Sequence, residues 1–162
     1  MKYGQYFEPM LLKEIPKPFD DKDFIYEIKF DGIRATVHAE PKKIKIFSRR
    51  GTDLTEIFPE LKAICKLVKK KTIFDGEIVA FKDGLPSFST LQKRNLLKNK
   101  NHIQKMVDEI PIVFVTFDCL FEGRDLTNKP LMERKAILDK FEENDFFVKS
   151  TYISKNGKAF FQ

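Results

Sequence analysis

Lys29 is the side chain best placed for chemistry. It lies two residues after Glu27, a spacing that places both side chains on one face of a strand, and several arginines follow it. The surrounding segment alternates between apolar and charged residues, so a strand here would point Glu27 and Lys29 to the same face. A lysine near other cations and shielded from water loses its proton more easily and becomes a nucleophile. Arg34, Arg49 and Arg50 could supply that cationic field. The alternative is an ordinary solvated strand face, where charged residues usually lie.

Arg134 is a second informative side chain, because it falls on the apolar stripe of a predicted helix. Leu131 and Leu138 lie on the same stripe. A guanidinium buried there needs a carboxylate or phosphate partner, since an unpaired buried charge is costly. Two partners stay open: an internal ion pair with Asp118 or Glu77, or a direct contact with a nucleotide.

The composition indicates one folded domain with an excess of positive charge. The chain has 162 residues, and 30 Lys+Arg against 24 Asp+Glu give a net charge of +6. The 42% hydrophobic content excludes a disordered chain, and the charge favours a polyanionic partner such as nucleic acid or a nucleotide. No signal peptide or membrane span is recognisable.

The cysteines and histidines give no sign of a metal site. Cys65 and Cys119 lie in apolar runs without metal-ligand spacing, which predicts buried, reduced thiols and fits a cytoplasmic protein. His38 and His102 also lack ligand spacing, so we expect both at the surface.

The periodicity predicts a single α+β domain with mainly antiparallel sheets flanked by helices, because strands often follow one another directly. Strands are predicted over residues 24–30, 33–39, 43–48, 72–81 and 112–121, and from 146 onward. Helices are predicted over 59–71, from a Ser87 cap to about 97, from Pro130 at a first helical position through PLMERKAILDKFEEN, and at KNGKAFFQ. The polar segment KNKNHIQK is expected to be an exposed loop.

Four short segments resemble the signatures of one enzyme superfamily. KFDGIR at 29–34 resembles the K-x-D-G-x-R signature of the covalent nucleotidyltransferases, which comprise ATP-dependent DNA ligases, RNA ligases and mRNA capping enzymes. SRRG at 48–51, FDGE at 74–77 and VTFD at 115–118 resemble later signatures in the family order. SRRGTDLTEIFPEL and PLMERKAIL are similar to bacterial ATP-dependent DNA ligases, particularly those related to the ligase domain of DNA ligase D.

The resemblance implies the ATP-grasp-like adenylation domain of a cytoplasmic bacterial DNA ligase. Lys29 would attack the α-phosphorus of ATP and hold AMP as a phosphoramidate. AMP would then pass to the 5′-phosphate of nicked DNA before phosphodiester formation, as in DNA repair and recombination. An RNA ligase of the same superfamily, or a catalytically inactive nucleotide- or DNA-binding module, remains an alternative.

The resemblance also implies a nucleotide-binding set, which consists of Glu27, Arg34, Arg49, Glu77, Phe117 and Arg134. Glu27 would accept a hydrogen bond from the adenine amino group, and Arg34 and Arg49 would contact ribose or phosphate. Glu77 would bind the ribose hydroxyl and, as the candidate metal ligand, Mg²⁺. Phe117 would stack on adenine.

Later family elements are not recognisable in the sequence. A D-G-x-x-x-K element, a K-x-K pair and an OB-fold domain would normally follow. Residues 1–162 are therefore expected to be the N-terminal part of an adenylation domain that adenylates poorly by itself. Exposed strand edges of such a domain are expected to permit dimerisation.

Overall fold

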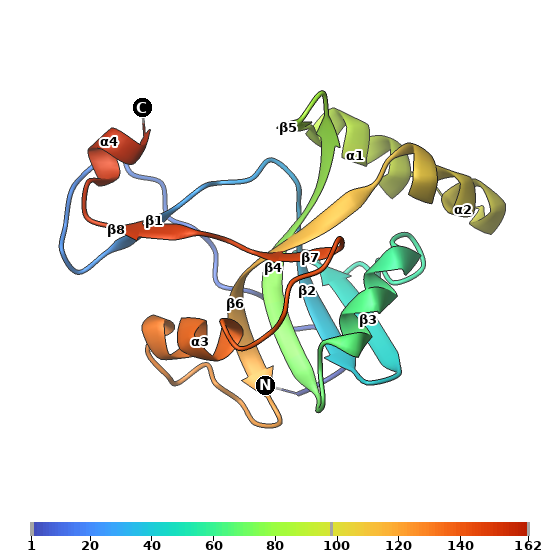
Figure 1. Ribbon diagram of the computed structural model, residues 1–162, viewed down its shortest axis with the longest axis horizontal. Helices are drawn as coiled ribbons and strands as arrows, with labels where there is room; N and C mark the ends of the chain where they lie inside the picture. The colour runs from blue at the N-terminus through green and yellow to red at the C-terminus, as the bar shows by residue number, and fades with distance from the viewer. Residues whose placement is uncertain (1, 98, 162) are drawn as a thin grey trace. The chain divides into compact units, whose positions relative to one another are not determined.

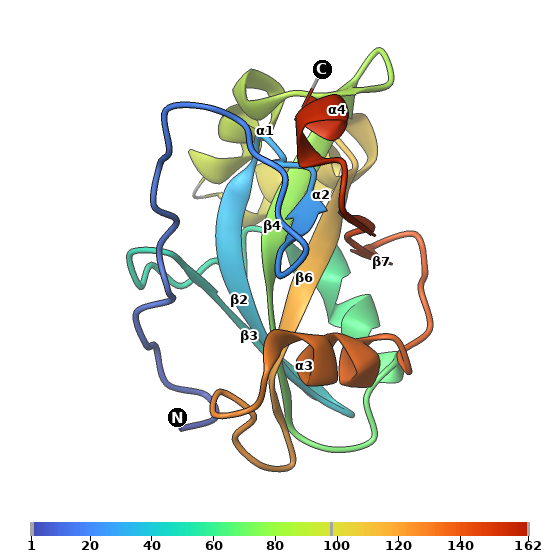
Figure 2. The same ribbon diagram turned by 90° about the vertical axis from the view of Figure 1, so that its left-hand side faces the viewer.

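The computed structural model describes residues 2–97 and 99–161, and the chain forms two compact units. The first unit comprises residues 2–8 and 30–149, and the second comprises residues 9–29 and 150–161. Figures 1 and 2 show the ribbon in two views. Five of the seven predicted site residues belong to the first unit, and the other two, Glu27 and Lys29, belong to the second.

A six-stranded sheet is the framework of the first unit. The strands lie in the order β3 (Lys43–Ser48), β2 (Ile33–Glu40), β4 (Thr72–Lys82), β6 (Ile112–Glu122) and β7 (Phe147–Lys149), and the short β5 (Leu85–Pro86) pairs with β4. Each pairing is antiparallel except that of β6 with β7, which is parallel. The predicted α+β class with mainly antiparallel strands is therefore confirmed.

One face of this sheet carries the hydrophobic core. Alternate side chains of β2, at Ala35, Val37 and Ala39, are buried there. The helical elements of the unit are the 3-10 helix η1 (Pro59–Lys66), α1 (Phe88–Asn95), α2 (Lys100–Glu109) and α3 (Leu131–Leu138). Since successive strand residues point to opposite faces, the intervening β2 side chains Arg34 and His38 are directed away from this core.

The second unit contains a small antiparallel pair and a short helix. β1 (Ile25–Glu27) pairs with β8 (Tyr152–Ser154), and α4 (Gly157–Phe161) follows. The Tyr26 ring fits against Gly157 so closely that a Cβ added to the glycine would lie 2.2 Å from it. Only glycine permits this approach of helix and strand.

Two predicted strands are shorter in the structure than their patterns suggested. The strand predicted over 24–30 ends at Glu27, because its partner β8 has only three residues. Lys29 therefore lies beyond the strand, and the prediction of a shared strand face with Glu27 is wrong. The strand predicted from 146 is divided into β7 and β8, which pair in different sheets.

The predicted helices also differ in type and extent. The helix predicted over 59–71 is the 3-10 helix η1, and the segment after Pro130 is helical only to Leu138, with Pro130 at the cap instead of the first turn. The predicted Ser87 cap is confirmed, since its hydroxyl accepts the Thr90 N–H at 3.4 Å.

The segment predicted as an exposed loop instead begins a helix. Within KNKNHIQK, α2 starts at Lys100, and residue 98 lies outside the described residues. The Asn99 side chain accepts the N–H groups of Asn101 and His102, at 2.9 and 3.4 Å. This cap satisfies donors that a helix start would otherwise leave unpaired, and the polar composition concealed it.

Candidate active site

The sheet face opposite the core carries an ion pair between β2 and β4. Arg34 donates from Nε to Asp75 Oδ1 at 3.2 Å and from Nη2 to Oδ2 at 2.8 Å. In the same register, Arg34 lies opposite Glu77. Burial raises the pKa of Asp75, and the hydrogen bonds from Arg34 oppose that rise. The arginine is therefore held flat against the sheet by a paired contact.

A second ion pair joins α3 to β6. Arg134 donates from Nε and Nη2 to the two carboxylate oxygens of Asp118, at 2.8 Å each, and also donates to the Lys129 carbonyl. The hydrogen bond to Asp118 raises the pKa of Arg134. Of the partners left open by the sequence, the internal pair with Asp118 is the one that the structure shows.

The strand β6 has an irregularity where it crosses this face. Asp75 pairs with Asp118 and Gly76 pairs with Thr116, so Phe117 has no opposite residue on β4. The Arg34 guanidinium lies over the Phe117 ring, 5.1 Å from its centroid. Four elements, β2, β4, β6 and α3, thus bring Arg34, Glu77, Phe117 and Arg134 to neighbouring positions.

The SRRG segment forms a tight turn beside Arg34. The Ser48 hydroxyl accepts the N–H groups of Arg50 and Thr52, at 3.3 and 3.0 Å, and Gly51 adopts φ +83°. The Arg49 N–H donates to the Arg34 carbonyl at 3.1 Å. The structure therefore brings the backbone of Arg49 next to Arg34, while the side chain of Arg49 is exposed.

Two glycines of the recognised segments permit close packing around the site. A Cβ at Gly32 would lie 2.2 Å from the Ile78 carbonyl oxygen, and one at Gly76 would lie 2.4 Å from the Val115 carbonyl oxygen. Contacts this short exclude any side chain without backbone movement. The glycine following each aspartate in KFDGIR and FDGE is therefore explained by strand packing.

The remaining two predicted residues lie in the second unit. Glu27 is the last residue of β1 and is half-buried, and Lys29 is exposed.

Lys135 is a residue of this region that the sequence reasoning missed. Its side chain is buried, with the residue only 2% exposed, and Nζ donates to the Phe117 carbonyl at 2.9 Å. Its position four residues after Leu131 and three before Leu138 places it on the predicted apolar stripe. That spacing was the signal that could have found it.

His38 lies on the same face as Arg34 but is completely buried, so the prediction of a surface histidine is wrong. Its Nδ1 accepts the Gly4 N–H at 3.0 Å, and the rings of Tyr3 and Phe7 lie 5.8 and 5.9 Å from it. Burial, with a smaller effect of Lys45, lowers the pKa of His38 to about 4. Long-range packing of residues 2–8 produces this burial, and no local pattern reveals it.

The predicted buried thiols and the predicted exposed His102 are confirmed. Cys65 and Cys119 are buried and free, and burial raises the pKa of Cys119 to about 12. His102 is exposed, as expected.

Among residues 2–97 and 99–161, no three His, Cys, Asp or Glu side chains are grouped closely enough to hold a metal ion. None of the described helices has the length and apolar character needed to cross a membrane.

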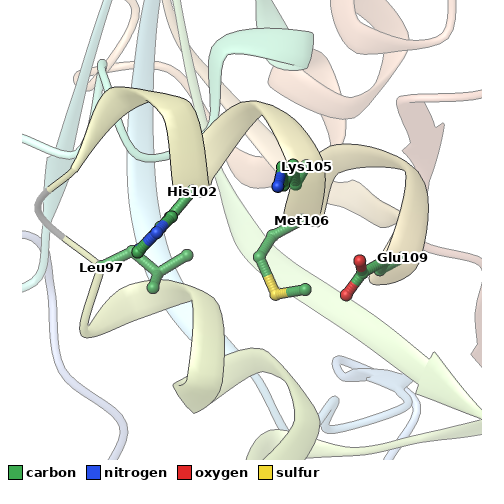
Figure 3. Close-up of a pocket in the computed structure, with 5 residues that line it drawn as sticks. All are labelled: Leu97, His102, Lys105, Met106 and Glu109. Carbon is green, nitrogen blue, oxygen red and sulfur yellow. The ribbon is translucent and has the colours of Figure 1, made fainter.

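A separate cavity of about 210 Å³ lies at α1 and α2 (Figure 3). It is lined by Leu97, His102, Lys105, Met106 and Glu109. In Figure 3 the Met106 side chain extends from α2 toward α1. None of the predicted nucleotide-binding residues lines this cavity.

Together, the antiparallel sheet and its flanking helices define a mixed α/β domain. A family model described as "ATP dependent DNA ligase domain" matches residues 9–159, and the chain belongs to this family.

Individual proteins agree with the family assignment. The chain is 35% identical over 161 residues to the SPbeta prophage-derived DNA ligase-like protein LigB of Bacillus subtilis, covering 96% of this chain and 55% of that protein. Two mycobacterial structures share the fold at 24% identity: the M. tuberculosis LigD ligase domain, with a TM-score of 0.64, and a DNA ligase D complexed with ATP and MES, with 0.63. Each comparison covers 84% of this chain and 42% of the other. The chain thus spans about half the length of these proteins.

Proposed function

We propose that this chain provides the adenylation function of an ATP-dependent DNA ligase, with Lys29 as the nucleophile. Lys29 Nζ would attack the α-phosphorus of ATP, forming a P–N bond as the bond to the bridging oxygen breaks and pyrophosphate leaves. The amine loses a proton in this step. The 5′-phosphate at a DNA nick then takes AMP from the lysine, and the 3′-hydroxyl displaces AMP to form the phosphodiester bond.

The first unit would supply the groups that bind ATP. Arg34 and Arg49 are adjacent through a main-chain hydrogen bond and carry planar guanidinium groups suited to phosphate or ribose oxygens. Phe117 is partly exposed, with Arg34 over one ring face, so a stacked adenine would use the other face. Arg134 would act beside Asp118 at the edge of this site. Glu27, which belongs to the second unit, would select adenine by accepting a hydrogen bond from its amino group.

Glu77 is the proposed ribose and Mg²⁺ ligand. A lone carboxylate fits Mg²⁺ when the nucleotide phosphates and water provide the other oxygens, which is the usual arrangement for this ion. Bound Mg²⁺ would neutralise charge on the phosphates, while Glu77 orients the ribose.

The observation that carries this proposal is the coincidence of the family match over residues 9–159 with the assembly of Arg34, Glu77 and Phe117 on one sheet face. The related mycobacterial DNA ligase D is complexed with ATP, which supports the choice of nucleotide. We further propose nicked duplex DNA as the partner of a protein containing this chain, since the family is a DNA ligase family.

The test is incubation of the chain with ATP and Mg²⁺, followed by intact-mass measurement. We expect a covalent AMP adduct on the parent chain that is lost in Lys29→Ala and retained in Lys22→Ala, where an exposed lysine of the same unit is removed. An adduct that persists in Lys29→Ala would refute the nucleophile. ATP binding without any adduct on the parent chain would instead favour a nucleotide-binding module without this chemistry.

A further inference from the structure

The helix α3 contacts the irregular part of β6 through two consecutive residues. Arg134 holds the Asp118 carboxylate, and Lys135 donates to the carbonyl of the preceding Phe117 at 2.9 Å. Figure 2 shows α3 lying across β6. The two side chains thus fix the peptide that joins Phe117 to Asp118.

This peptide lies at the register shift between β6 and β4. Phe117 has no residue opposite it on β4, so the regular ladder does not determine its orientation. A second bond joins the two strands beside the irregularity, where the Thr116 hydroxyl of β6 donates to the Asp75 carbonyl of β4 at 3.2 Å. The orientation of the Phe117 ring therefore depends on contacts around the irregularity.

The choice of a lysine at position 135 indicates that its ammonium group is needed. The residue is 2% exposed, and lysines are seldom buried because removing the charge from water is costly. A methionine would fill similar space without that cost. The hydrogen bond to the Phe117 carbonyl offsets part of that cost and ties the ammonium group to the irregular part of β6.

We propose that Lys135 is a positioning residue for base recognition, acting through the Phe117 main chain. It touches no nucleotide itself. It holds the Phe117 carbonyl so that the ring presents its face to a purine, with the Arg34 guanidinium 5.1 Å away over the ring. This inference rests on the proposed function, because it requires that Phe117 stacks on adenine.

The test compares equilibrium binding of ATP with that of inorganic triphosphate, which has no base. Lys135→Met removes the donor and keeps the volume. We expect ATP affinity to fall about threefold to tenfold, the size of an aromatic stacking contribution, with triphosphate affinity unchanged. Lys135→Arg, which keeps a donor, should restore much of the difference. Lys140→Met removes an exposed lysine just after α3 and should change neither ligand.

A double variant separates positioning from general damage to the fold. In a Phe117→Leu background, Lys135→Met should cause no further loss of ATP affinity, because the ring that it positions is gone. Equal losses for ATP and triphosphate, or the same loss in both backgrounds, would overturn the positioning role. If Lys135→Met does not fold, Lys135→Gln tests the same contact, because its shorter, uncharged side chain loses the ammonium group, and an unchanged ratio of ATP to triphosphate affinity would also refute the proposal.

The same binding measurements distinguish a failure of the proposed function from a failure of the Lys135 role alone. A parent chain that binds ATP no more tightly than triphosphate would show that no base is recognised, and the proposed function would fail with the positioning role. A parent chain that prefers ATP, with variants that keep this preference, would refute only the role of Lys135.

Discussion

Three arginines of the first unit each contact a carboxylate, but they lie in two different environments. Arg94 is completely buried; it pairs with Glu60 and donates to the main-chain carbonyls of Ile57 and Ile110, at 3.0 and 3.1 Å. Arg34 and Arg134 pair with aspartates on the polar sheet face, and their side chains remain 17% and 14% exposed.

The comparison separates arginines that hold the fold from arginines that can bind a ligand. Arg94 joins α1 to η1 and has no access to solvent, so its pair is an internal connection. Arg34 and Arg134 keep part of their surface open while an aspartate fixes their orientation. A guanidinium held in place this way loses less conformational freedom when a phosphate or ribose binds.

Breaking the buried pair should give the largest loss of stability. Arg94→Met leaves Glu60 without its cation in a site where the acid side chain is only 4% exposed. We expect the free energy of unfolding to fall by about 3–5 kcal/mol, measured by urea denaturation. ATP affinity of the folded fraction should be unchanged. A loss below about 1 kcal/mol would place Arg94 with the accessible arginines instead.

His38 extends the comparison along β2. It lies on the same sheet face as Arg34, but residues 2–8 cover it. Its pKa of about 4 in the folded chain is below the ordinary value of 6.5, so the folded state favours the neutral ring. Stability should therefore be full above pH 6.5 and decline as the pH falls toward 4, by roughly 3 kcal/mol.

The His38 contribution is measured as the difference between variants, since carboxylates also titrate in this range. His38→Asn keeps an acceptor for the Gly4 N–H without a titrating ring, and its stability should decline less between pH 6.5 and 4. His102→Gln, at an exposed position, should follow the parent profile. Parallel profiles for the parent chain and His38→Asn would contradict the buried neutral histidine.

Weakening an accessible pair should affect binding more than stability. Arg34→Lys keeps the charge but loses the two-point contact with Asp75. We expect stability to fall by about 1–2 kcal/mol and ATP affinity by roughly tenfold, the equivalent of one charge-assisted hydrogen bond. Calorimetry would measure the affinity.

The Lys70–Glu122 pair provides the matched control for Arg34→Lys. The side chains of this surface pair are 55% and 30% exposed. Lys70→Ala should change stability by less than about 1 kcal/mol and leave ATP affinity unaltered. If Arg34→Lys behaves like Lys70→Ala, Arg34 is not part of a nucleotide site.

Much of the sheet could be predicted from local composition and alternation. Alternation indicated the strand over 33–39, and apolar composition indicated those over 72–81 and 112–121. Together with 43–48, these predictions match β2, β3, β4 and β6 within one residue. The strand over 24–30 was predicted too long because its pairing partner, β8, lies far along the chain. Local patterns do not report the length of a distant partner.

The sequence alone was sufficient to indicate the family and to identify Lys29, Arg34, Arg49 and Glu77 as candidate site residues. Residue types and their spacing along the chain can be read without knowing how the side chains pack. The tertiary structure alone decided that Arg134 pairs with Asp118, that Lys135 supports Phe117 and that His38 is buried. Each of these depends on contacts between segments distant in the chain. Burial and charge pairing depend on the tertiary environment of a side chain. They distinguish a residue that stabilises the fold from one that can bind a ligand.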